Sequence, residues 1–125
     1  MALRSEKTKS SVKTGEVVSL VAGFGYEVPD PDEVGQYLLE HLDVIPILQE
    51  ATREIPHFFP LEAHRVLRVF HDQEWGDFGP LFVVIEWPRD ASSDAGNRLD
   101  RFENEWWIPK AIASSMGSQL VFDVA

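Results

Sequence analysis

The stretch SDAGNRLDRFENEWWI, residues 93–108, has the clearest helical pattern in the chain. At about 100° per residue, one stripe of this helix contains four apolar side chains, Ala95, Leu99, Phe102 and Trp106. A stripe of this kind is what a helix buries against a core. Trp107 lies about 100° from the centre of the stripe, so we expect the core to leave it free for a contact outside the chain.

Strand-like runs lie on both sides of this helix. Residues 62–72, EAHRVLRVFHD, alternate so that Val66 and Phe70 share one face, and residues 81–87, LFVVIEW, form the clearest strand of the chain. Residues 119–124 supply a last strand. We expect the first two strands to pair antiparallel and the third to lie beside either one, with a crossover through the helix if it runs parallel to the second.

Two helices are expected before the strands. Asp30 and Pro31 are typical of a helix start, which predicts a helix over residues 31–42. Pro46 interrupts the pattern, so a second helix is expected over residues 44–54, before Pro56 closes the helical region. Residues 16–28 are ambiguous between a short strand and an apolar helical turn.

These elements predict an α+β fold. The expected sheet is small, mostly antiparallel, has three or four strands and is packed on one face by helices, in the order α-α-β-β-α-β. Residues 1–14 are rich in Lys, Ser and Thr and are expected to form a flexible basic arm, and residues 15–125 a single domain.

The charge of the chain is uneven and limits its partners. The 125 residues carry a net charge of −10. Four basic residues and one acidic residue give the arm +3, which leaves −13 for the rest. An acidic body repels nucleic acid and anionic membrane surfaces, and no apolar run approaches the roughly 20 residues that span a bilayer. The absence of cysteine suits a cytoplasmic protein without disulfides.

We expect neither a metal nor a cofactor. His64 and His71 point to opposite faces of one strand, and the histidines show no zinc-binding spacing. The acidic turn with Asp72, Glu74 and Asp77 fails the calcium-loop pattern, so we interpret it as a polar turn.

Weak candidates for catalysis are Tyr37 and His41 on the first helix and His64 and Glu86 on the strands. Glu86 shares a face with Phe82 and Val84. On a core face its carboxyl group would be a candidate general base, and on an exposed face it would be an edge-protecting charge.

Four aromatic residues near the ends of elements are better candidates for an interface: Trp75, Phe78, Trp87 and Trp107. Tryptophan combines a large apolar area with an N–H donor and is enriched at binding hot spots. These residues favour contact with another protein.

Arg98-Leu99-Asp100-Arg101-Phe102 followed by Trp106-Trp107 gives the helix the form R-L-D-R-F-x-x-x-W-W. From about Phe59 onward, the chain resembles a loose group of small uncharacterised bacterial proteins in which such a helix lies between strands. The resemblance implies an α+β fold and a bacterial cytoplasmic setting, and no activity.

The sequence therefore favours a non-enzymatic protein-interaction or assembly module, such as a regulatory or antitoxin-like protein, that self-associates or binds another protein. The alternative is a small enzyme or ligand-binding protein with a pocket between sheet and helices.

Overall fold

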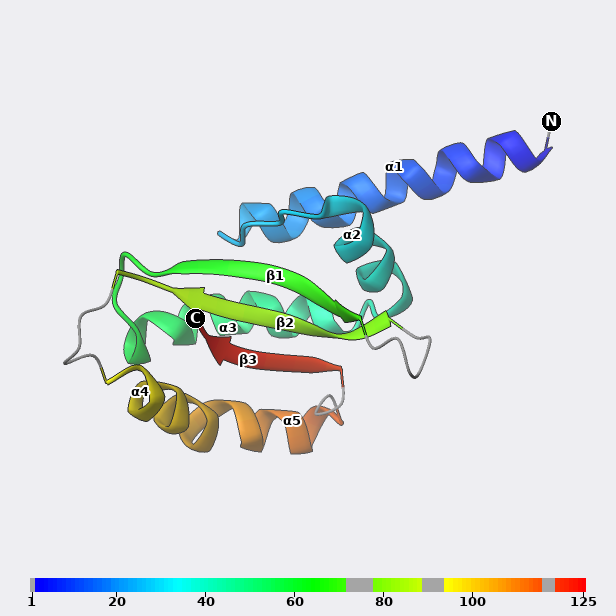
Figure 1. The fold of residues 1–125 in the computed structure, drawn as a ribbon. Coiled ribbons are helices and arrows are strands. Elements are labelled where there is room, and N and C mark those ends of the chain that lie inside the picture. Colours follow the sequence, from blue (N-terminus) through cyan, green and yellow to red (C-terminus); the bar gives the residue numbers. More distant parts are fainter. Residues whose placement is uncertain (1, 72–77, 89–93, 116–118) are drawn as a thin grey trace.

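The computed structural model describes residues 2–71, 78–88, 94–115 and 119–125, with the side chains of residues 13–70, 80–88, 94–115 and 119–125. Its elements are α1 (Ala2–Gly23), α2 (Pro31–Glu40), α3 (Val44–Phe58), β1 (His64–His71), β2 (Phe78–Glu86), α4 (Ala95–Phe102), a π-helical turn η1 (Glu103–Trp107), α5 (Ile108–Ser114) and β3 (Leu120–Val124) (Figure 1). The predicted α+β class is confirmed.

The described strands form one mixed sheet in the order β1-β2-β3. β1 and β2 pair antiparallel, and β2 and β3 pair parallel, because the chain crosses over through α4 and α5 between them. The outer edge of β1 is partly covered by Glu27, whose N–H donates to Arg65 O (2.7 Å) and whose carbonyl accepts from Leu67 N–H (2.9 Å). β3 lies at the other edge.

One face of the sheet holds the core. Successive side chains of a strand point to opposite faces, and alternate apolar residues of all three strands lie under the helices. Figure 1 shows α3 passing behind the strands. The core-facing strand residues are Leu67, Val69, Leu81, Val83, Ile85, Leu120 and Phe122, and they cluster with Val21, Val34, Leu38, Val44, Leu48, Ile55, Phe102 and Trp107 of the helices.

The backbone of α1 differs from the expectation for the N-terminal segment. The helix begins at Ala2, so it includes most of the residues expected to form a flexible arm, and it resolves the ambiguity of residues 16–23. Its C-terminal half packs on the body, where Val21 is fully buried, while the backbone of its N-terminal part projects beyond the other elements (Figure 1). The boundary between arm and domain at residue 14 stays a prediction.

The next two helices follow the sequence signals closely. Asp30 caps α2 by accepting a hydrogen bond from Glu33 N–H, and Pro31 occupies the first turn. Tyr26, just after α1, donates its hydroxyl to Leu48 O of α3 (2.7 Å) and so ties the N-terminal region to the core. α3 runs on through Pro56 to Phe58, slightly further than predicted.

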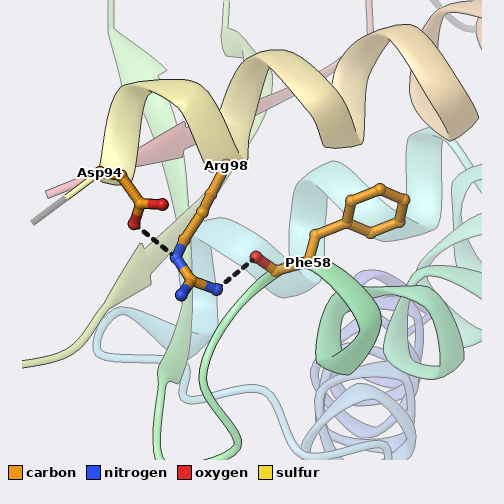
Figure 2. Close-up of polar contacts among 3 residues, drawn as sticks. All are labelled: Phe58, Asp94 and Arg98. Atoms are coloured by element: carbon orange, nitrogen blue, oxygen red, sulfur yellow. Dashed lines mark hydrogen bonds and ion pairs between the residues drawn. The ribbon is translucent and has the colours of Figure 1, made fainter.

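Arg98 joins α4 to the end of α3 (Figure 2). Its Nε donates to Asp94 Oδ1 (2.7 Å), and its Nη1 donates to the carbonyl of Phe58 (3.0 Å). Phe58 is the last residue of α3, and the last carbonyls of a helix have no partner within the helix. The guanidinium therefore satisfies a helix terminus in addition to forming an i,i+4 ion pair with Asp94.

The expectation that the core leaves Trp107 free is wrong. Its side chain is only 6% exposed, and its ring centroid lies 5.0 Å from that of Phe122. In η1 the Ile108 N–H donates to Glu103 O, five residues earlier, so the turn holds an extra residue and the 100° periodicity fails there. Pro109 gives a physical reason, because its ring would clash with the carbonyl of Glu105 in a regular α-helix.

The contact between α1 and α2 depends on Gly35. A Cβ at this position would overlap the Thr14 methyl group and lie 3.1 Å from both Thr14 O and Val18 Cγ2.

We expect Gly35→Ala to lower the free energy of unfolding by about 1–3 kcal/mol, because α1 must shift away from α2. Gly96→Ala in α4 is the matched control. It meets nothing within 4 Å and should be neutral or stabilise by up to about 1 kcal/mol. Urea denaturation measures both, and equal stabilisation by the two variants would contradict this packing.

Candidate functional site

The face of the sheet opposite the core has no helix across it in the described part of the chain (Figure 1). We call it the open face. Its apolar residues, from all three strands, are Val66, Phe70, Phe82, Val84 and Val121, and none of them belongs to the core cluster. Val66 is itself buried, at 5% exposed, whereas the other four are at least partly exposed. The register places Val66 beside Val84, and Phe82 beside Val121, so they form one continuous group at the centre of the face.

Phe70 and Phe82 make this group aromatic. Their ring centroids are 5.7 Å apart with an interplanar angle of 29°, so the two rings stack across β1 and β2. Phe70 is 48% exposed. Stacking covers part of each ring but leaves apolar surface in water, which folding of this chain alone does not remove. The stack is therefore the strongest sign of a contact with another molecule.

Charged residues border the apolar group on opposite sides. Arg68 is exposed on β1 next to Phe82, and Asp123 is exposed on β3 next to Val84. Neither makes an ion pair within the described residues. Burial, and after it the nearby charges of Asp100 and Asp123, raise the pKa of the Glu103 carboxyl. The open face thus has a basic β1 side and an acidic β3 side.

Two of the catalytic candidates, Tyr37 and His41, form a pair that supports the fold. The rings stack with centroids 4.1 Å apart, and the Tyr37 hydroxyl donates to Gln119 O (2.6 Å). His41 Nδ1 lies 3.0 Å from Tyr37 O, and because a carbonyl only accepts, Nδ1 carries the proton. Burial raises the pKa of Tyr37, so its hydroxyl serves as a donor at neutral pH. The pair connects α2 to the start of β3.

The other two candidates, His64 and Glu86, lie opposite each other on the open face. His64 Nδ1 is 2.8 Å from Glu27 Oε2, and both side chains are largely exposed. Gln119 O accepts from Leu81 N–H, five residues before Glu86, so the two pairs are about 17 Å apart along β2. The four candidates therefore form two separate pairs. Glu86 lies on the open face rather than the core face, which favours the edge-charge interpretation over the general base.

The predicted interface residues have mixed positions. Trp107 is buried against Phe122. Trp87 is half-buried, with its ring centroid 5.7 Å from that of Phe59. Trp75 lies outside the described residues, together with the acidic turn of residues 72–77, and of Phe78 only the backbone at the start of β2 is described. The interface role of these residues stays a prediction.

Neither a metal site nor a membrane span is found in the described residues. No three His, Asp or Glu side chains there come close enough together to hold a metal ion. None of the helices in that part of the chain combines the length and apolar character needed to cross a bilayer.

Sequence reasoning found the strand alternation but missed the open face as a site. The pattern of residues 62–72 already placed Val66 and Phe70 on one face. The pattern could not show which face the helices cover, because both faces of this strand carry apolar side chains. One signal in the sequence could have identified the uncovered face: Phe70 and Phe82 each share a strand face with charged residues.

The two tyrosines of the chain predict the behaviour of the protein at alkaline pH. Burial raises the pKa of Tyr26 to about 12 and also raises that of Tyr37, while hydrogen bonding with the Thr52 side chain and with the Leu81 backbone, respectively, acts in the opposite direction. Below pH 10.0, the pKa of an unfolded tyrosine, the stability gained by burying the neutral hydroxyls is complete. As pH rises from about 10 toward about 12, the unfolded state ionises first, so the contribution is lost.

We therefore expect the free energy of unfolding of the wild-type chain to fall across this interval more steeply than that of Tyr26→Phe. The difference should be on the order of 2–3 kcal/mol. Urea denaturation at a series of pH values measures it, and comparison between variants removes the shared titration of the lysines. Tyr37→Phe is the matched control and should flatten the curve less. Parallel curves for wild type and Tyr26→Phe would contradict the buried environment of Tyr26.

Comparison with known proteins gives no relative for this chain. No protein-family model, curated protein or solved structure matches it with significance. The function of the chain is therefore inferred from the residues of the open face and their arrangement.

Proposed function

We propose that this chain is a non-enzymatic protein-interaction or assembly module, and that the open face of the sheet is its binding surface. The single observation that carries the proposal is the stack of Phe70 on Phe82. The two rings sit at the centre of an apolar group and remain partly in water. Burial of that apolar surface against a partner supplies a favourable free energy that the isolated chain does not gain.

The arrangement of the open face agrees with the anatomy of protein interfaces. Such interfaces have an apolar, often aromatic centre and a polar rim, and here Arg68 and Asp123 border the aromatic stack. The side chains project from paired strands, so their backbone is already ordered. Less conformational entropy is then lost on binding than if the same residues came from a loop.

The proposal includes the regulatory or antitoxin-like role and the bacterial cytoplasmic setting expected from the sequence. The form of the helix that ends in Trp106 and Trp107 supports the bacterial cytoplasmic setting, and the regulatory or antitoxin-like role is one form that a non-enzymatic interaction module can take. The alternative, a small enzyme or ligand-binding protein, would use Tyr37, His41, His64 and Glu86. It stays a prediction, and the separation of these residues into two pairs gives it no added support.

Phe82→Asp tests the binding surface directly. A carboxylate at the centre of the open face should abolish association by making burial of this surface costly, whereas the core on the opposite face is untouched. Ile112→Asp is the matched control, because Ile112 is 76% exposed on α5 and lies outside the open face. Association is measured as sedimentation of the purified chain and as recovery of purified untagged chain and of host proteins on the tagged chain.

We expect Phe82→Asp to lose the association that the wild type and Ile112→Asp both show. Circular dichroism and the thermal unfolding midpoint establish that each variant is folded. If folded Phe82→Asp retains every association of the wild type, the open face is not the binding surface.

A further inference from the structure

We infer that the partner of the open face is a second copy of this chain. In this arrangement the two sheets pack face to face about a twofold axis parallel to the strands and above β2, and Arg68 of each copy pairs with Asp123 of the other. The inference rests on the proposed function, since it names the partner of the same surface.

The charge pattern of the open face is the first reason for choosing a second copy. Arg68 lies on the β1 side and Asp123 on the β3 side, both are exposed, and neither has an ion-pair partner among the described residues. A surface with a basic side and an acidic side is complementary to its own copy when the copy is turned so that unlike sides meet. No separate partner with a matching pattern is then required.

The register of the strands determines which rotation of the second copy brings the unlike charges together. Arg68, Phe82 and Val121 form one row across the sheet, and Val66, Val84 and Asp123 form the next. An axis parallel to the strands places β1 of one copy over β3 of the other, with the rows kept level. Arg68 then lies one row from Asp123 of the other copy, about 6.7 Å along the strand, which an extended arginine side chain can reach.

The same axis brings the aromatic residues together. Because it passes above β2, Phe82 and Val84 of one copy face the same residues of the other, with Phe70 beside them. Sheets packed face to face cross at about 30°, so the axis lies about 15° from the direction of β2, and a crossing centred on Phe82 separates the two Glu86 carboxylates at the far end of β2. An axis perpendicular to the strands would instead place Arg68 over the β1 side of the copy, and like charges would meet.

The size of the face sets the expected strength of the dimer. Three strands spaced about 4.8 Å apart, each with about five residues, cover roughly 250 Å² in the plane of the sheet. Stable interfaces bury about 800 Å² on each partner. We therefore expect a weak dimer, with a dissociation constant on the order of micromolar or above, that forms as the chain is concentrated.

Charge reversal tests the arrangement. Dissociation constants of the full chain are measured by sedimentation equilibrium at low and high salt for wild type, R68D, D123R and the double variant R68D/D123R. Each single reversal changes two symmetric contacts and should weaken the dimer about tenfold at low salt, while the double variant should return to within about threefold of wild type. High salt should reduce these differences. The matched control, R101D, reverses an exposed charge of α4 outside the open face and should leave the dimer unchanged.

The outcomes separate this inference from the proposed function. If the wild type dimerises and F82D abolishes the dimer, but the two reversals act independently, the open face binds a copy in another orientation and this inference fails alone. If the wild type stays monomeric at every concentration while F82D still abolishes capture of a host protein, the partner is a different protein and the inference again fails alone. If F82D changes no association, both fail.

Discussion

The packing of Phe102 and Trp107 on Phe122 determines how the rest of the chain is arranged. Their ring centroids lie 4.9 and 5.0 Å from that of Phe122, in the centre of β3. This contact fixes the crossover segment, α4 to α5, on the same side of the sheet as α3. Because all the helices that pack on the sheet then lie on one side, the opposite side remains open in the described part of the chain. The binding surface proposed for this protein follows from where these two aromatic rings are buried.

The π-helical turn makes that packing available. In a regular α-helix, Phe102 and Trp106 would share the buried stripe, and Trp107 would point away. The extra residue in η1 brings Trp107 into the core while Trp106 stays half-buried, with its centroid 5.3 Å from that of Phe102. A buried tryptophan contributes several kcal/mol, which is ample to offset one poorly bonded turn. The turn also accommodates Pro109, so one local distortion removes a clash and fills the core.

Much of the fold could be predicted from local patterns, whereas the site could not. Strand alternation gave the three strands, the antiparallel pairing of β1 and β2 and the residues that share each face, because the side-chain period of a strand is exact. The cap at Asp30 likewise located α2. The prediction for Trp107 failed because it assumed constant helical periodicity through residues that precede a proline. The helix α1 was missed because its first half has no apolar stripe to reveal it.

The open face required the tertiary structure for a more general reason. Alternation shows that Phe82 and Val84 lie opposite Leu81 and Val83, but both sets are apolar, and only the placement of the helices shows which set is covered. The charge pattern also required the tertiary structure, since Arg68 and Asp123 are distant in sequence and are placed on opposite sides of the same face only by the register of β1, β2 and β3.

The most direct test of the open face as the binding surface is carbene footprinting of the wild-type chain at low and high concentration, read out by residue. We expect labelling of Phe70, Phe82 and Val121 to fall as the concentration rises, while Leu61 and Ile112, which are exposed outside the open face, are labelled equally at both. Unchanged labelling of the open face in a chain that sedimentation shows to self-associate at the higher concentration, or protection of Ile112 in its place, would contradict the claim that the open face is the surface through which this protein associates.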